Sequence, residues 1–255
     1  MNRFLILLFS IFLIGCFSEP KFLNNGLTKN ATKITEYIIK IEHDSLNNEV
    51  QDTLSITEKK YNDNDQIVNR IQKTLIDNNE LKIDYIYDNS NNLKTEIVKM
   101  STDSLPFTVD YIYKDSVLHQ TKAIVKTSNE IFEQVETYYY RKNKTKEKTI
   151  TTLLFINLEL SDTLRNSVSK SCFDKNEVIE KIETVHPNNT KRNIKTVYEY
   201  DCSTLIGLKH FDQNDSLLNN LKYEYKMDEF DNWIIKNIIR NDKLDTKLTR
   251  EIKYK

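Results

Sequence analysis

The stretch that decides the fold is Leu81-Lys82-Ile83-Asp84-Tyr85-Ile86-Tyr87-Asp88. Apolar or aromatic side chains occupy every second position, at residues 81, 83, 85 and 87, with Lys82 and Asp84 between them. A period of two residues is that of a β-strand with one buried face. Asp88 then begins a polar segment rich in Asn, which is typical of a turn. The stretch therefore predicts a strand that ends in a hairpin turn.

The same unit recurs along the chain: an aromatic residue, any residue, a second aromatic residue, a charged residue and a polar turn. We call the last residue before the turn the anchor. The anchors are Tyr61, Tyr87, Tyr113, Tyr140, Phe173, Tyr200 and Met227. Five of the six intervals between anchors are 26 or 27 residues, and the sixth is 33 residues because of an insertion near positions 151–160. Such a period predicts a repeat architecture.

An apolar residue opens the returning strand five or six residues after most anchors. These residues are Ile67, Leu93, Leu118, Ile179, Leu205 and Trp233, and the fourth copy has Lys146 at this place. Each repeat is therefore predicted to be a two-stranded β-hairpin that is joined directly to the next one.

Two further segments complete the predicted fold. Ile34 to Ile41 alternates like a strand, and 247–254 is predicted to be the terminal strand. No segment of ten or more residues has the 3.6-residue period of a helix. We expect an all-β protein, with an open, twisted antiparallel sheet built from about seven β-hairpin repeats. The predicted divisions are a signal peptide at 1–15, a lipidated tether at 16–33 and the repeat domain at 34–255.

The repeats resemble a known family. The units Tyr85-Ile86-Tyr87-Asp88 and Asp228-Glu229-Phe230-Asp231-Asn232-Trp233 are similar to YD (Rhs-type) repeats and to related hairpins of envelope lipoproteins. The similarity spans about residues 59–240, with Asp231 in place of the family's turn glycine and Met227 in place of its second aromatic residue. Large Rhs proteins wind such repeats into a shell. The resemblance implies an open, curved sheet here, because seven copies are too few for a closed shell.

Tyrosine pairs form the most distinctive candidate surface. The pairs are Tyr85 with Tyr87, Tyr111 with Tyr113, Tyr138 with Tyr140, and Tyr198 with Tyr200. Within each pair the two rings share one face of the strand. Packing between neighbouring strands is the first interpretation. The alternative is an exposed aromatic platform that binds a sugar or a protein partner.

Common catalytic motifs are absent from the sequence. Only three glycines occur, Gly15, Gly26 and Gly207, so no phosphate-binding or dinucleotide-binding loop can be built. The four histidines lie far apart in sequence, and the acidic runs at 62–65 and 228–231 are explained by turns. We expect no enzyme activity, no cofactor and no metal. A net charge of −1 also argues against a nucleic-acid partner.

The N-terminus predicts the cellular location. Arg3 precedes an apolar run at residues 4–13, which is too short to span a bilayer as a helix but matches a signal peptide. The run ends in Leu13-Ile14-Gly15-Cys16, which resembles the lipobox of bacterial lipoproteins. The resemblance implies acylation of Cys16 and a membrane-attached envelope protein, with the outer membrane favoured because Phe17 is not Asp. The alternatives are an ordinary cleaved signal peptide and an uncleaved anchor.

The other two cysteines, Cys172 and Cys202, lie in neighbouring repeats. In an oxidising envelope they can form a disulfide, and the alternative is two buried free thiols. The segment 141–148 contains five basic residues and is predicted to be a hairpin tip. It is interpreted as a solvated turn, with a contact to phosphate-bearing lipid or polysaccharide as the alternative.

Two functional hypotheses follow. The first is a non-catalytic, lipid-anchored binding or scaffold protein for an unknown protein or glycan partner. The second is a carrier that shelters lipid or acyl chains in a curved β-sheet. The second hypothesis rests on architecture alone.

Overall fold

The computed structural model describes residues 31–43, 48–101, 106–126, 130–157, 162–187, 189–201 and 204–255. They form sixteen strands and one short 3-10 helix, η1 (Thr190–Arg192). The strands are β1 (Ala31–His43), β2 (Glu49–Tyr61), β3 (Ile67–Thr74), β4 (Asn79–Tyr87), β5 (Leu93–Met100), β6 (Phe107–Lys114), β7 (Val117–Lys126), β8 (Glu130–Tyr140), β9 (Lys146–Asn157), β10 (Asp162–Phe173), β11 (Ile179–Val185), β12 (Ile194–Asp201), β13 (Thr204–Phe211), β14 (Leu217–Met227), β15 (Trp233–Arg240) and β16 (Lys243–Tyr254).

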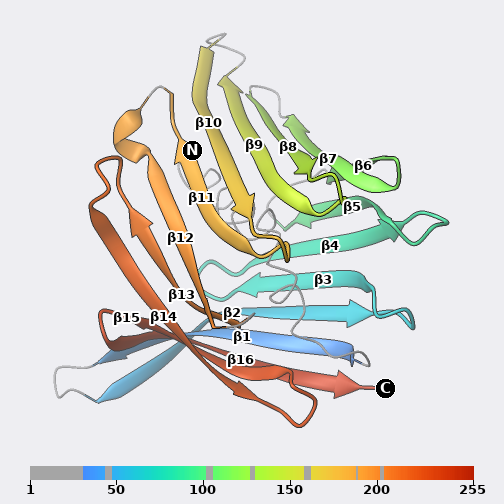
Figure 1. Ribbon diagram of the computed structural model, residues 1–255. Helices are drawn as coiled ribbons and strands as arrows, with labels where there is room; N and C mark the ends of the chain where they lie inside the picture. The colour runs from blue at the N-terminus through green and yellow to red at the C-terminus, as the bar shows by residue number, and fades with distance from the viewer. Residues whose placement is uncertain are drawn as a thin grey trace.

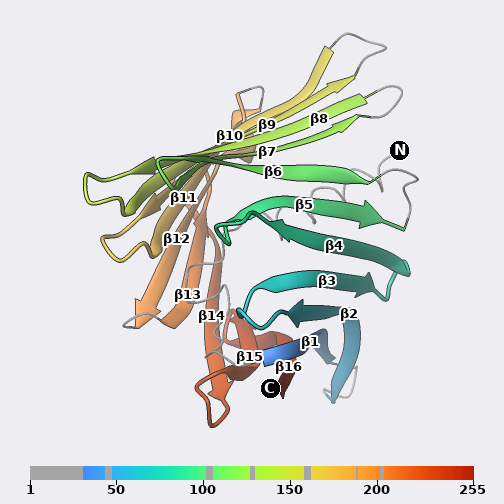
Figure 2. The same cartoon turned by 90° about the vertical axis from the view of Figure 1, so that its right-hand side faces the viewer.

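The sixteen strands form one closed antiparallel barrel (Figures 1 and 2). Each strand pairs with its neighbours in sequence, and β1 also pairs with β16. In Figure 1, β3 to β5 run across the view while β10 to β13 run steeply, so the strand direction changes strongly around the barrel. Such a change follows from the twist of β-sheets.

The predicted open sheet is therefore wrong, although the all-β class is right. The seven hairpins supply β2 to β15, and the two terminal strands β1 and β16 close the ring. Their pairing joins Glu36 to Arg250 and Ile34 to Ile252, more than 200 residues apart in sequence. Closure removes the two free edges that an open sheet would leave with unpaired backbone groups.

The hairpins lie at the positions that the sequence predicts. All seven anchors are the last or next-to-last residue of an even-numbered strand, β2 to β14. Because alternate strands run in the same direction, the turns that follow the anchors lie at one end of the barrel, which we call the first rim. The start of β1 and the end of β16 lie at this rim too.

Every anchor also marks a β-bulge. The strand register shifts between the anchor and the residue before it, at Tyr61, Tyr87, Tyr113, Tyr140, Phe173, Tyr200 and Met227. A bulge bends its strand and increases the local twist. Seven bulges at one rim give the sheet repeated curvature, which is a physical reason for closure that the count of hairpins did not include.

The turns at this rim use Asn and Asp in the way the composition suggests. In the turn Asp88–Asn92, Oδ1 of Asp88 accepts hydrogen bonds from the backbone N–H groups of Ser90 (2.8 Å) and Asn92 (2.9 Å). The fourth residue, Asn91, has a left-handed φ of 63°. The same position is left-handed in four other first-rim turns, at Asp65, Lys144, Glu177 and Asp231.

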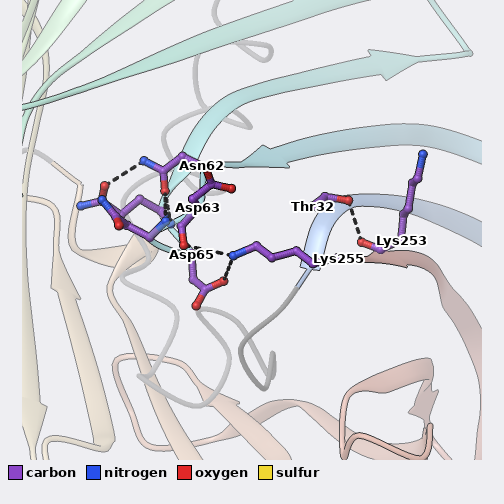
Figure 3. Close-up of polar contacts among 8 residues, drawn as sticks. Thr32, Asn62, Asp63, Asp65, Lys253 and Lys255 are labelled. Atoms are coloured by element: carbon purple, nitrogen blue, oxygen red, sulfur yellow. Dashed lines mark hydrogen bonds and ion pairs between the residues drawn. The ribbon is translucent and has the colours of Figure 1, made fainter.

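Contacts between turns and strand ends fix the seam between β1 and β16 (Figure 3). Thr32 Oγ1 donates a hydrogen bond to the Lys253 carbonyl at 3.0 Å. Lys255 Nζ lies 3.1 Å from both Asp65 Oδ1 and the Asp63 carbonyl oxygen in the turn after β2. On the other side, the Tyr254 hydroxyl donates to Asp228 and accepts from Asn232 in the turn after β14. The last strand is thus held by the turns on both sides.

Candidate functional site: the inner face of the barrel

The two faces of the barrel wall differ sharply. In β4, Leu81 and Ile83 are buried, and Tyr85 and Tyr87 share their face, while Lys82 and Asp84 point to the other side. The buried face is the inner one, because side chains from strands two apart approach each other on it. Arg70 of β3, for example, acts electrostatically on Glu36 of β1 and on Glu96 of β5.

All four predicted tyrosine pairs lie on this inner face. Three of the four anchors among them brace the preceding hairpin through their hydroxyl groups. Tyr87 donates to the carbonyl of Ile67 at 2.8 Å, Tyr113 to that of Leu93 at 3.0 Å and Tyr140 to that of Leu118 at 2.6 Å. Each acceptor opens the returning strand of the hairpin before. These rings therefore have a structural role, whatever else they contact.

The remaining tyrosines of the pairs are held in two ways. Tyr111 donates to Glu96 at 2.6 Å, and Tyr138 donates to Glu136 at 2.7 Å. Tyr198 and Tyr200 pack against the buried cluster of Phe173, Ile179 and Ile182. Burial raises the pKa of Tyr85, Tyr198 and Tyr200 well above the ordinary value, and that of Tyr87 to about 12.

A basic wall covers part of the inner face, on β15, β16, β1, β2 and β3. We define it by six cationic side chains: Lys40, Lys59, Arg70, Lys236, Arg240 and Arg250. The carboxylates of Glu36 and Asp245 lie among them, and Asp52 and Glu42 share the face of Lys40 near the ends of β1 and β2. Cations outnumber carboxylates here among the residues that the structure describes.

Glu36 and Arg250 form a buried ion pair within this group. Glu36 Oε2 lies 2.9 Å from Arg250 Nε, and the guanidinium of Arg250 stacks on Trp233 with Cζ 3.3 Å from the ring centre. Burial alone would raise the pKa of the Glu36 carboxyl, but Lys59, Arg250 and Arg70 together hold it below the ordinary value. The carboxyl is therefore ionised at neutral pH.

The second part of the basic wall is more open to solvent. Asp245 Oδ1 lies 3.1 Å from Lys40 Nζ and 3.4 Å from Arg240 Nε. The side chains of Lys40 and Arg240 remain 36% and 40% exposed. Lys236 lies over the rings of Tyr223 and Tyr225, at 4.3 and 5.7 Å from their centres. Lys40 and Arg240 are therefore accessible to an anion from solvent.

The inner face of β4 to β6 is apolar instead. Leu81, Ile83, Val98 and Met100 form a buried cluster, with Tyr85, Phe107 and Val109 packed against it. Two carboxyls of the inner face, Glu96 of β5 and Glu136 of β8, are also deeply buried, and burial raises the pKa of both above the ordinary value. The inner face is thus divided into a basic and a largely apolar wall.

Sequence reasoning found the tyrosine pairs but missed the basic wall. Its six cations come from both ends of the chain, and no local pattern joins Glu36 to Arg250. It also missed Tyr223 with Tyr225, a fifth pair on the inner face, whose spacing matches that of the other pairs. A search for aromatic-x-aromatic alone would have found it.

The other predicted residues are placed as follows. Cys16 lies outside the described residues, as does Cys202. Cys172 is a free thiol on the outer face of β10, and the disulfide stays a prediction. Within the basic tip, Arg141 is a structural residue, since it donates to the carbonyls of Lys146, Asp174 and Phe173 at 2.6 to 2.8 Å.

The described part of the chain shows no group of three or more His, Cys, Asp or Glu side chains arranged to hold a metal. Nor does it contain a helix that is long and apolar enough to cross a membrane.

Two solved structures share this fold. A porin-like protein from Bacteroides vulgatus ATCC 8482 superposes with a TM-score of 0.52, at 13% sequence identity, over 88% of this chain and 98% of that chain. A porin-like protein from Bacteroides uniformis ATCC 8492 gives the same TM-score and coverage at 10% identity. At these identities the similarity shows the fold alone. No family model matches the sequence, and no curated protein matches it.

These similarities correct the resemblance to YD-repeat lipoproteins. The chain repeats its hairpins, but they form a closed barrel of the kind found in the two porin-like structures, and not an open sheet of YD repeats. The similar units Tyr85-Ile86-Tyr87-Asp88 and Asp228–Trp233 share a local structure, an Asp turn at the end of a strand with a β-bulge in the strand that returns from it. Such a local motif is compatible with more than one global fold.

Proposed function

We propose that this chain is a non-catalytic β-barrel protein of the bacterial cell envelope, located at the outer membrane, that holds small anionic ligands against its basic wall. The predicted signal peptide and the fold shared with porin-like proteins support the location. The single observation that carries the binding role is the basic wall itself.

The basic wall carries more cations than carboxylates. Six cations share it with Glu36, Asp245, Asp52 and Glu42, and Lys40 and Arg240 are more than a third exposed although they face inwards. A barrel of sixteen strands encloses more space than its inward side chains fill. An anion that enters this space gains charge-assisted hydrogen bonds, and Arg offers a planar fork that suits carboxylate and phosphate groups.

A specific observation favours a second candidate, the carrier of acyl chains. The apolar cluster of Leu81, Ile83, Val98 and Met100 shares the inner face with the basic wall. An amphiphile with an anionic head and an alkyl chain would match both surfaces. Each methylene removed from water adds about 0.8 kcal/mol to binding, so a chain would strengthen the binding of the head.

The test is calorimetry at low salt on the full chain, with inorganic phosphate and dodecyl phosphate as probes. Lys59 and Lys60 are neighbours in β2 on opposite faces, which makes them a matched pair. We expect Lys59→Gln to weaken binding roughly fivefold, the equivalent of about 1 kcal/mol, and Lys60→Gln to leave it unchanged. Tighter binding of dodecyl phosphate than of phosphate supports the carrier. Equal effects of the two substitutions, or no binding of either probe, would refute the binding role.

Attachment through a lipid on Cys16 is part of the proposal, because several acyl chains give stable membrane binding. Cys16→Ala should then move the protein from the membrane fraction to the soluble envelope fraction. A variant that remains with the membrane would show that something other than this residue holds the protein there.

A further inference from the structure

The outer face of the barrel carries the inference. A barrel wall that contacts lipid needs an outward apolar band about 25 Å tall, and charged side chains are strongly disfavoured in the middle of it. The outward side chains of this barrel do not meet that requirement.

Ion pairs stand on the outer face in the middle of the strands. In β4, Lys82 Nζ lies 3.0 Å from Asp84 Oδ2, with the side chains 45% and 44% exposed. In β11, Lys181 and Glu183 form a pair at 2.9 Å. Neither pair lies at a rim, because each strand continues on both sides of it.

The pairs also occur on several sides of the barrel. Lys33 and Glu58 join β1 to β2 at 3.0 Å, and Lys122 and Glu133 join β7 to β8 at 2.9 Å. Lys209 of β13 pairs with Glu199 of β12. Charged side chains therefore occur at described outward positions of most strands, whereas the outward positions of β9 after Lys148 are Ile150, Thr152, Leu154 and Ile156. In β14 the outward positions Asn220, Lys222, Glu224 and Lys226 are all polar.

We propose that the outer wall of this barrel faces water along its full height, and that the barrel stands beside the bilayer instead of spanning it. In water, these charged side chains are stabilised by their ion-pair partners and by hydration, because they are half exposed. Inserted in lipid, each of these lysines and carboxylates would lose its water, and their combined cost would rival the whole stability of a domain. The barrel is then surrounded by water and does not form a pore across the bilayer.

The inference goes beyond the proposed ligand binding and is tested independently of it. Outer-membrane vesicles that contain the full chain are treated with a membrane-impermeant, amine-reactive reagent after mild opening, and the modified lysines are identified by mass spectrometry. Lys82, Lys122 and Lys181 report the middle of the wall. Lys142 and Lys144, exposed in the turn after β8, are the controls.

The expected result is that the mid-wall lysines react at rates similar to those of the two controls. If the barrel spans the bilayer, they should react on the order of 100-fold more slowly, since burial in lipid disfavours them by that factor or more. Protection of all three mid-wall lysines would overturn the proposal.

A substitution gives a second, independent measurement. Ile112 is 43% exposed on the outer face of β6, whereas Ile83 is 4% exposed on the inner face of β4. We expect Ile112→Lys to leave the amount of folded protein in the envelope unchanged and Ile83→Lys to reduce it severely. A similar loss from Ile112→Lys would contradict a wall that faces water.

Discussion

Arg250 of β16 and Glu36 of β1 form a buried ion pair across the seam where the barrel closes. Arg250 Nε lies 2.9 Å from Glu36 Oε2, and the two side chains are only 3% and 14% exposed. The residues are direct partners in the β1–β16 register, so the pair links the two ends of the chain. The pair holds β16 from inside the barrel, whereas the contacts of Tyr254 and Lys255 hold the end of the same strand at the rim.

Removing one partner of this pair should destabilise the barrel. Arg250→Met leaves the Glu36 carboxylate buried without its main partner, which costs about 3 kcal/mol in comparable buried pairs. The measurement is the free energy of unfolding in urea. The control is Lys33→Met, which breaks the half-exposed Lys33–Glu58 pair between β1 and β2 on the outer face. That pair should contribute about 0.5 kcal/mol, and equal losses would show that the seam does not depend on the buried pair.

The dependence of stability on pH should differ in sign between two buried carboxyls. The pKa of Glu36 is lowered in the folded state, because neighbouring cations outweigh its burial. Its contribution to stability is present above the ordinary carboxyl range and is lost as pH falls through that range. The pKa of Glu136 is raised by burial, which the hydrogen bond from Tyr138 only partly opposes. Its contribution is present at acid pH and is lost as pH rises through the raised pKa.

The two substitutions to glutamine separate these effects. Glu36→Gln should cost stability at pH 7, and the cost should shrink toward about pH 4, where the unfolded state begins to bind a proton before the folded state does. Glu136→Gln should increase stability at pH 7 relative to its effect at pH 4. Urea unfolding at pH 4, 5.5 and 7 measures both slopes. Slopes of the same sign for the two variants would show that their charge environments are alike.

The local hairpins of this protein were predictable from its sequence, whereas the closure of the barrel was not. The positions of the seven hairpins were predictable to within one residue, because alternation, an aromatic anchor and an Asp or Asn turn are all local signals. Closure was not predictable in this way. It depends on the pairing of Ile34 with Ile252, and on bulges that a sequence pattern shows only as the spacing between an anchor and its turn.

On the inner face, too, the features set by local sequence were predictable and those set by barrel closure were not. The tyrosine pairs stand in one strand each, so the two-residue period was enough to place each pair on one face. The basic wall collects Lys59 and Arg70 from one end of the chain and Arg240 and Arg250 from the other. Only the closed topology brings them to one surface.

The anchor tyrosines allow a sharp test of their structural role, because Tyr139 and Tyr140 are neighbours on opposite faces of β8. The Tyr140 hydroxyl donates to the Leu118 carbonyl at 2.6 Å, whereas Tyr139 is 40% exposed on the outer face. Tyr140→Phe should cost about 1 kcal/mol, the usual contribution of such a hydrogen bond. Tyr139→Phe should cost little, since its ring still meets Lys148. Thermal unfolding distinguishes the two, and a neutral Tyr140→Phe would mean that the brace does not contribute to stability.

The left-handed turn positions should respond in the opposite direction. Lys144 has a φ of 64°, a conformation that costs a residue with a Cβ about 1 kcal/mol relative to glycine. Lys144→Gly should therefore stabilise the barrel by up to about 1 kcal/mol, even though glycine gives the unfolded chain more freedom. Lys142, in the same turn, has no positive φ, so Lys142→Gly should be neutral or destabilising. Unfolding of both variants in urea gives the comparison. A loss of stability in Lys144→Gly as large as that in Lys142→Gly would show that the turn after β8 is not strained at its fourth residue.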